Sequence, residues 1–237
     1  MRGAGGGRSV TPLPAAVSYW EARYAAGERP WGDGPSELAR LVVARLGSVS
    51  RRGEDAPFAL LDVGCGYGRD SRYLASELGC AVVGVDPSPA AIAAARASRR
   101  RALDVSFVMG DAASFAAHSA NVGSFAVAVC VQVYGLLGPS ARREFVDALA
   151  ALLRPGGLLF LCTLSPRDPQ HYAVGRPVTG EQRSWIHRTY LHFCTAEELV
   201  GDFAEFEILD LEERAYQEAV ADGTHHHASW FLEARRR

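Results

Sequence analysis

Short apolar runs alternate with amphipathic segments along most of this chain. The apolar runs predict buried strands at residues 58–63, 80–85, 105–109, 125–131 and 158–163. Apolar residues at helical spacing predict helices at residues 38–46, 71–78, 88–99 and 141–153. Continuous apolar strands are typical of a parallel sheet that is covered on both faces. The pattern therefore predicts an α/β fold with helices on both faces of a mostly parallel sheet.

Near the C-terminus the pattern changes. Thr195 and Glu198 have the spacing of a helix-capping box, so a helix is expected to start there. Two further strands are expected at residues 206–213 and 228–234, joined through residues 215–224. No crossover helix has room after Thr224, so the last strand does not fit a purely parallel sheet.

Three stretches stand apart from this alternation. Residues 1–14 are rich in glycine and are expected to be a disordered tail. Residues 15–34 combine a short helix with a loop that holds several aromatic side chains, and we expect this stretch to cover the site. Residues 165–194 contain prolines and glycines that disfavour a long helix, together with aromatic and histidine side chains, and are expected to form a substrate lid. Apart from the tail, the whole chain is expected to form a single domain, residues 15–237.

A glycine-rich turn follows the first predicted strand, with glycine at positions 64, 66 and 68 and a helix starting near Arg69. Glycine lacks a Cβ, so the main chain can turn sharply there and a cofactor can approach it closely. The dinucleotide fingerprint requires a third glycine where Arg69 stands. Asp62, two residues before the turn, would repel a pyrophosphate but suits a cationic amino group.

Two more acidic residues follow the next strands. Asp86 ends the second strand, where a carboxylate can accept both hydroxyls of a ribose, and it can also cap the next helix. Asp111 follows the third strand, at a position where dinucleotide enzymes generally require no acid. The pair indicates an adenosine-type ligand, and Asp111 argues against a dinucleotide.

Composition narrows the choice of partners. The 237 residues, 48% hydrophobic and 22% charged, suffice for one large domain. Lys and Arg (25) nearly balance Asp and Glu (27), so no overall charge favours nucleic acid or a membrane surface. A small molecule is the expected partner, and the chain is expected to be a monomer or a homodimer.

The cysteines and the apolar runs bear on the compartment. Five scattered cysteines are expected to be reduced, buried thiols in a cytoplasmic protein rather than disulfides or zinc ligands. The longest apolar stretch, residues 125–137, is shorter than the roughly 20 residues that span a bilayer. A cytoplasmic location without a secretory signal is therefore expected.

The run from Leu60 to Asp70 resembles the first motif of the class I S-adenosylmethionine (SAM)-dependent methyltransferases. The Leu-x-Pro-Gly-Gly sequence at residues 153–157 is also similar to a recurrent feature of that superfamily. Tyr19-Trp20 followed by Pro30-Trp31 looks like the N-terminal cover of its thiopurine and tellurite-resistance groups. The resemblance implies a Rossmann-like, seven-stranded, mostly parallel sheet in which a reversed C-terminal strand inserts beside the fifth.

The resemblance also implies a SAM site. Asp62 would face the methionine amino group, Asp86 the ribose and Asp111 the adenine amino group. An aromatic face attracts a cation such as a sulfonium, so Tyr19 and Trp31 are expected to cover the cofactor. The full set of predicted cofactor-binding residues is Tyr19, Trp31, Asp62, Gly64, Cys65, Gly66, Asp70, Asp86, Pro87, Asp111, Ala112 and Val131.

Catalytic candidates come from two places. Gln132 and Tyr134 follow the fourth strand, beneath the expected reactive end of the cofactor. His171, Tyr172 and His192 lie in the predicted lid, and a histidine there could take a proton from an attacking nucleophile. Many members of the superfamily have Phe-Asp at the start of this strand and a histidine pair after it. Here these places hold Phe125-Ala126 and Gly135-Leu136, so no general base is carried over.

Three consecutive histidines, His225 to His227, raise the question of a metal. Adjacent residues of a strand point to opposite faces, so at most two of them can converge on one ion. No Cys or His pair with zinc spacing lies nearby. No metal is expected, and we interpret the run as the polar start of a strand that could line a substrate pocket.

The resemblance and the residues together predict methyl transfer from SAM to a small-molecule nucleophile by in-line displacement. The acceptor atom, whether oxygen, nitrogen, sulfur or carbon, stays open. Three alternatives remain: intramolecular cyclisation of SAM that releases methylthioadenosine, an NAD-linked oxidoreductase, and a SAM-binding module without turnover.

Overall fold

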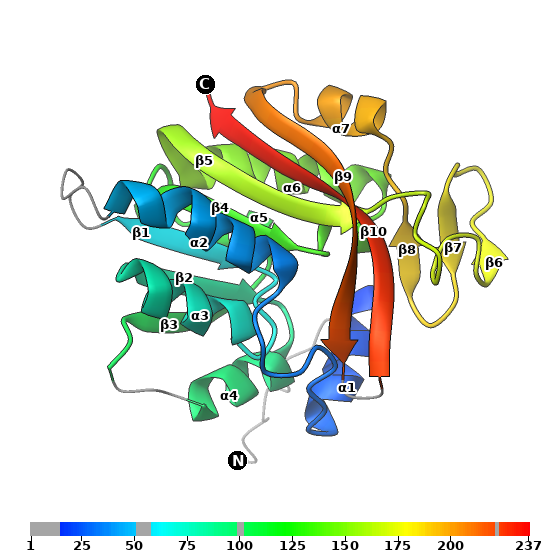
Figure 1. The fold of residues 1–237 in the computed structure, drawn as a ribbon, viewed down its shortest axis with the longest axis horizontal. Helices are drawn as coiled ribbons and strands as arrows, with labels where there is room; N and C mark the ends of the chain where they lie inside the picture. The colour runs from blue at the N-terminus through cyan, green and yellow to red at the C-terminus, as the bar shows by residue number, and fades with distance from the viewer. Residues whose placement is uncertain (1–14, 51–57, 99–101, 221–222) are drawn as a thin grey trace, which may run out of the picture.

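Seven strands form one sheet in the computed structural model, which describes residues 15–50, 58–98, 102–220 and 223–237 (Figure 1). The strand order is β3-β2-β1-β4-β5-β10-β9, and β10 runs antiparallel to both of its neighbours while the pairs from β3 to β5 are parallel. This confirms the predicted fold class, including the reversed strand beside the fifth. The tail expected at residues 1–14 lies outside the described residues.

The strands of the main sheet are β1 (Ala59–Val63), β2 (Ala81–Asp86), β3 (Val105–Met109), β4 (Phe125–Val131), β5 (Leu153–Leu164), β9 (Phe206–Val220) and β10 (Gly223–Arg236). The helices are α1 (Ala15–Ala25), α2 (Glu37–Ser50), α3 (Arg69–Leu78), α4 (Pro89–Ala97), α5 (Ala112–Ala116), α6 (Pro139–Leu152) and α7 (Ala196–Asp202), with short 3-10 helices η1 (Ser119–Asn121) and η2 (Tyr134–Leu136). The predicted boundaries of β3 and β4 are confirmed without change.

The sheet has an apolar core on each face because side chains alternate along its strands. Leu60 of β1 packs with α2 and α3 on one face, and its neighbour Leu61 packs with α6 and α7 on the other. On β10, Phe231 faces the α2 side and Leu232 the α6 side. In the same way β10 directs the odd-numbered His225 and His227 toward the α2 side. Figure 1 shows these helices on either side of the sheet.

Helix starts follow the local sequence signals. Ser88 caps α4 through its side chain, and Thr195 and Glu198 form the predicted capping box of α7. α3 begins after Gly68 and ends at Gly79, both in the left-handed conformation. Gly47 does not end α2, which continues to Ser50.

The C-terminal hairpin is longer than the sequence pattern predicts. A connection was expected at residues 215–224, whereas β9 continues to Val220 and pairs with β10 from Gly223 onward. This part of the ladder mixes small residues with polar ones, such as Glu218 opposite His225, so no apolar alternation marked it as strand. In Figure 1 the far end of the hairpin reaches down to α1.

Residues 165–194 form a small structure of their own rather than an irregular loop. Three short strands make an antiparallel sheet in the order β6 (Arg176–Pro177), β7 (Ser184–Ile186) and β8 (Tyr190–His192). Tyr172, Trp185 and Phe193 pack edge to face beneath it, with ring centroids 4.7 to 5.7 Å apart. The aromatic content that suggested order in this segment thus makes its core.

Two further findings concern the chain as a whole. All five cysteines are free and buried, as predicted. In the described ranges, no helix combines the length and the apolar character that crossing a membrane requires.

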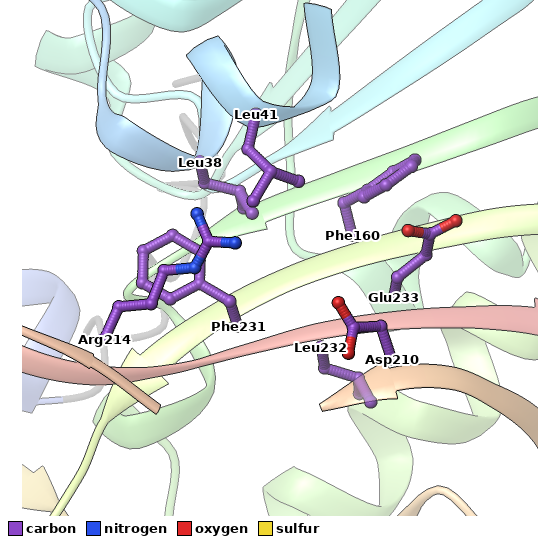
Figure 2. Close-up of a pocket in the computed structure, with 8 residues that line it drawn as sticks. All are labelled: Leu38, Leu41, Phe160, Asp210, Arg214, Phe231, Leu232 and Glu233. Carbon is purple, nitrogen blue, oxygen red and sulfur yellow. The ribbon is translucent and has the colours of Figure 1, made fainter. Parts of the chain in front are cut away.

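A recess on the α2 side of the sheet does not serve as a site. Figure 2 shows side chains from α2, β5, β9 and β10 around it, among them Phe231 and Glu233. Its volume of about 10 Å³ suffices for about one water molecule. The recess is therefore too small to hold a cofactor.

Candidate active site

The glycine turn between β1 and α3 has the geometry that the sequence predicts. Gly64, Gly66 and Gly68 have φ angles of 74°, 53° and 74°, a region that residues with a Cβ rarely adopt. The amides of Gly64 and Cys65 both donate to the carbonyl of Val85 in β2, which fixes the turn on the sheet. A Cβ at Gly64 would lie 2.1 Å from Cγ2 of Val133, so only glycine fits there.

Three acidic side chains lie at or near the carboxyl ends of three neighbouring strands. Asp62 lies in β1, Asp86 ends β2 and Asp111 follows β3. One carboxylate oxygen of Asp86 accepts the Gly66 amide at 2.8 Å and the other accepts the Ser88 amide at 2.9 Å. Asp111 is exposed, and it caps α5. The structure therefore brings these three predicted residues to one edge of the sheet.

Asp62 is buried and receives a hydrogen bond from the Ser71 hydroxyl. Burial raises the pKa of this carboxyl to about 7, and the neighbouring carboxylates of Asp70 and Asp86 act in the same direction. Burial also raises the pKa of Asp86. The Ser71 hydrogen bond and the positive charge of Arg69 act against this increase at Asp62. The floor of the turn thus holds three buried carboxyl groups, one of which, Asp70, is paired with Arg69.

Asp70 and the first turn of α3 hold the N-terminal segment in place. Asp70 accepts the Ser36 amide at 2.8 Å. Arg69 lies beside Asp70, bonds to the Trp31 carbonyl at 2.7 Å and pairs with Glu218 of β9 at 2.8 Å. The residues that start α3 therefore connect the turn to residues 31–36 and to the hairpin.

α1 lies over the glycine turn. The aromatic residue by which it contacts the turn is Tyr24, whereas Tyr19 was expected to cover the site. The Tyr24 hydroxyl lies against Gly66, where an added Cβ would be 3.0 Å from it, and its ring meets Tyr67 edge to face. Tyr19 instead contacts Trp20 and Arg23 of its own helix. Tyr24 therefore replaces Tyr19 as the α1 residue at the turn.

Two further contacts hold this segment. Trp31 packs between Trp20 and His225, with ring centroids 5.7 and 6.3 Å away. Glu21 accepts the Ala90 amide at the start of α4 at 3.0 Å. The cover thus joins α4 on one side and the hairpin on the other.

The other predicted cofactor positions are framework residues around the turn. Cys65 is buried, with its pKa raised well above the ordinary value by burial. Pro87 follows Asp86, Val131 ends β4, and Ala112 starts α5 with a buried side chain. All of these residues lie beside the turn or at the strand ends next to it.

Gln132 and Tyr134 do not both face a ligand. Gln132 has φ of 56°, a strained conformation for a residue with a Cβ, and its amide nitrogen bonds to the Ser229 hydroxyl at 2.9 Å. Tyr134 is fully buried among Phe145 and Phe203, and its hydroxyl donates to Asp202. The structure corrects the expectation for Tyr134: it is a core residue.

Two of the three candidates in residues 165–194 are structural. His192 is buried, with one ring nitrogen 2.8 Å from the Ser184 hydroxyl and the other 2.9 Å from Glu198. Burial alone would raise the pKa of Glu198, but contacts with His192 and Arg183 hold it at about 2. Tyr172 belongs to the aromatic core of the segment. Both residues thus stabilise the small sheet.

His171 lies in a cluster that sequence reasoning did not assemble. Asp168 bonds to His171 at 2.9 Å and to His227 of β10 at 3.2 Å, and the two imidazoles stack in parallel with centroids 5.4 Å apart. His225 meets both rings edge to face. Two of the three consecutive histidines thus share one face, as expected. The missed residue is Asp168, whose only signal was its place three residues before His171.

A cleft of about 220 Å³ shares lining residues with the surroundings of this cluster. Residues 31–37, the start of α2 and the end of β9 line it, and the Arg69–Glu218 pair lies in its wall. Trp31 and Glu218 belong both to the cleft and to the surroundings of the histidines, since Glu218 lies 3.9 Å from the Nε2 atom of His227. The residues that line the cleft include Trp31, Tyr216 and Glu218 but none of the three histidines, so the cleft lies next to the surroundings of the cluster rather than at the histidines themselves.

Comparison with known proteins identifies a matching family model and sequence relatives of this chain. A family model described as a methyltransferase domain matches residues 60–157. The chain is 34% identical over 169 residues to a ubiquinone biosynthesis O-methyltransferase of Xanthomonas oryzae pv. oryzae, covering 68% of each chain. It is 36% identical over 157 residues to the enzyme of that name from Xanthomonas axonopodis pv. citri, where it spans 63% of the relative's length and 64% of its own.

A solved structure agrees with the sequence relatives. A SAM-dependent methyltransferase from Methanosarcina mazei superposes with a TM-score of 0.66 at 25% identity, covering 79% of this chain and 96% of its own. The match to the family model ends at residue 157, before the segment that holds His171.

Proposed function

The chain belongs to the SAM-dependent methyltransferases, and from this premise we propose that it transfers a methyl group from SAM to a small-molecule nucleophile. The observation that carries the proposal is the set of carboxyl groups at the glycine turn. Asp62, Asp70 and Asp86 are buried together; Arg69 pairs with Asp70, and among the described residues neither Asp62 nor Asp86 forms an ion pair. SAM brings an ammonium and a sulfonium group, which can supply positive charge beside Asp62.

Each residue of the turn has a proposed role toward SAM. Asp62 faces the ammonium group, the main chain of residues 64–66 forms the cradle, Asp86 accepts from the ribose and Asp111 from the adenine amino group. Trp31 and Tyr24 cover the bound molecule with aromatic faces. SAM supplies a methyl group that is already activated for displacement by the positive charge on sulfur.

The remaining task of the protein is alignment and exclusion of water. Holding two reactants in line is worth up to about 7–11 kcal/mol of the barrier. We assign residues 165–194 as the lid over the acceptor, because they pack beside the hairpin at the end of the sheet where α/β folds bind ligands. The name of the relatives suggests an oxygen acceptor, and the lid lies beyond the residues matched by the family model.

The test of the proposal is product analysis after incubation with SAM and a panel of phenols, amines and thiols. S-adenosylhomocysteine together with a methylated acceptor is expected. Methylthioadenosine without a methylated acceptor would instead show that the chain cyclises SAM. Tight SAM binding in calorimetry with neither product across the panel would show a binding module, and a thermal shift with NAD but not SAM would indicate an oxidoreductase.

Asp111→Ser is expected to weaken SAM binding several-fold, because Asp111 is the residue assigned to the adenine amino group. Serine keeps the side-chain cap of α5 but is too short to reach a ligand in the same place. Calorimetric affinity is the measurement. Thr195→Ala removes the side-chain cap of α7, a helix that lies away from the turn. It serves as the control that shows whether a small loss of stability by itself weakens SAM binding. Equal affinities of wild type and Asp111→Ser would refute the assignment.

SAM affinity is expected to rise with pH between about 5.5 and 7.5. The folded pKa of Asp62 is about 7, above the ordinary 3.8, so the free protein holds a proton there in acid. An ammonium group beside the carboxyl favours the charged form, so binding releases that proton. The dissociation constant then falls by at most about tenfold per pH unit.

Calorimetry at pH 6 in two buffers of different ionisation enthalpy measures this proton release. Asp62→Asn is expected to remove both the release and the pH dependence. In the ligand-free protein the same raised pKa makes the free energy of unfolding fall as pH rises from about 4 to 7, because the folded state binds the extra proton. Binding without proton release at pH 6 would show that the ammonium group lies elsewhere.

A further inference from the structure

Asp168 is the centre of the histidine cluster. Its side chain is completely buried and accepts five hydrogen bonds: the amides of Gln170, His171 and Ala228, and one ring nitrogen each of His171 and His227. Burial alone would raise the pKa of the Asp168 carboxyl, but these two histidines hold it well below its usual range. Asp168 is therefore an anion that fixes two imidazoles in place.

The contacts of Asp168 determine which ring nitrogens remain available. Both imidazoles turn Nδ1 toward the carboxylate, so each carries its hydrogen on Nδ1 and has a lone pair on Nε2 in the neutral form. The Nε2 atom of His227 lies 3.9 Å from Glu218, and His227 is only 5% exposed. His171 is 29% exposed. Of the two, His171 is the imidazole that an acceptor can reach.

A chain of contacts joins this cluster to the glycine turn. Val133 packs against Gly64, and its neighbour Gln132 bonds to Ser229 of β10. Gln132 also bonds to the Tyr216 hydroxyl at 3.2 Å, and the Tyr216 ring lies against His227 with centroids 5.3 Å apart. The histidines therefore lie beyond the ends of β4 and β5, on the side of the sheet that also holds Asp62.

The same three residues invite a metal interpretation, which their hydrogen bonds disfavour. The ligand atoms of Asp168, His171 and His227 lie within 4.8 Å of one another. An ionised carboxylate offers about four lone-pair positions, and Asp168 already accepts five bonds. A metal would have to displace both imidazole contacts from Nδ1. The geometry is that of a carboxylate that orients a base.

We propose that His171 is the general base of the methyl transfer and that Asp168 is its positioning residue. This inference rests on the proposed function and specifies its acceptor as a hydroxyl group. Nε2 of His171 takes the hydroxyl proton while the oxygen forms its bond to the methyl carbon. The bond from that carbon to sulfur breaks, and its electron pair stays on sulfur. The proton then leaves His171 for solvent, so charge and atoms balance.

A first test needs no acceptor. Long-range proton–nitrogen NMR spectra of the wild-type imidazoles at pH 8 are expected to show His171 with hydrogen on Nδ1 and a bare Nε2. Asp168→Asn is expected to disturb this tautomer while the chain stays folded. Elemental analysis of the purified protein tests the alternative that the cluster binds a metal. The opposite tautomer in wild type, or one equivalent of a metal that Asp168→Asn removes, would overturn the proposal.

The second test is kinetic and uses the phenols of the product panel. His171→Gln is expected to lower kcat at least about 100-fold, since a positioned base contributes 10²–10⁴-fold, with calorimetric SAM affinity changed less than twofold. Added imidazole is expected to restore part of the rate with His171→Ala. Thiol acceptors that are ionised at the assay pH should lose far less. Undiminished phenol turnover by His171→Gln, or a panel in which only thiols or amines react, would overturn the proposal that His171 is the general base.

Asp168→Asn serves as the test of positioning. With Asp168→Asn, kcat toward phenols is expected to fall while the KM for the phenol stays close to the wild-type value, because the imidazole loses the carboxylate that fixes its hydrogen on Nδ1. The other titratable groups near His171 are His225 and His227, with Glu218 and Arg69 behind them. His225→Gln, which leaves both contacts of Asp168 in place, is the matched control. A kcat that Asp168→Asn leaves unchanged would contradict the role of Asp168. Absence of SAM binding by wild type would instead refute the proposed function itself.

Discussion

Replacing Gly64 with alanine is expected to lower the free energy of unfolding by about 2–5 kcal/mol and to abolish SAM binding. Two costs add at this position. A φ of 74° costs a residue with a Cβ about 1–2 kcal/mol. The new methyl group would also lie 2.1 Å from Cγ2 of Val133, and such overpacking costs about 1–3 kcal/mol. Because Val133 is β-branched, its side chain cannot turn away freely.

Denaturant unfolding and calorimetry with SAM measure the two effects. Gly79→Ala is the matched control: Gly79 has φ of 63° but no atom within 4 Å of an added Cβ, so only the conformational cost applies. The double variant Gly64→Ala/Val133→Ala is expected to recover the steric part. Equal destabilisation by the Gly64 and Gly79 changes would show that contact with Val133 does not decide the requirement for glycine.

The elements that the sequence predicted well are those with purely local signals. The apolar runs of β3 and β4 and the glycines around α3 required no knowledge of the rest of the chain. The far part of the β9–β10 hairpin was missed because it mixes polar side chains with small ones and has no apolar alternation. These strands are held by the ladder and by contacts such as Arg69 with Glu218, which join residues far apart in sequence.

The same distinction applies to the site. Asp62, Asp86 and Asp111 could be placed because the carboxyl ends of neighbouring parallel strands meet at one edge. Tyr134 and His192 were misplaced because only packing shows that they are buried. Tyr24 and Asp168 were missed because their significance depends on the docking of α1 and of residues 165–194, which no local pattern encodes.

Replacing Arg69 with methionine is expected to cost about 3–5 kcal/mol of folding free energy and to lower Tm by roughly 6–20 °C. Arg69 is only 8% exposed and serves two carboxylates, Asp70 and Glu218, as well as the Trp31 carbonyl. Methionine fills a similar volume, so the loss comes from leaving buried charges without their partner. The change also removes the contact of α3 with the Trp31 carbonyl, so that the Ser36 amide bond to Asp70 is left to hold residues 31–36 to the start of α3.

Thermal and denaturant unfolding of Arg69→Met test this prediction against Arg235→Met. The pair of Arg235 with Glu207 has a similar distance of 3.0 Å, but both side chains are about half exposed, so its loss should cost less than about 1 kcal/mol. The double variant Arg69→Met/Glu218→Gln is expected to recover at least about 1 kcal/mol, because it removes one of the stranded charges. A cost for Arg69→Met no larger than that for Arg235→Met would mean that solvent already compensates Glu218 and Asp70. The hairpin would then be held to the glycine turn by packing around Trp31 rather than by charge.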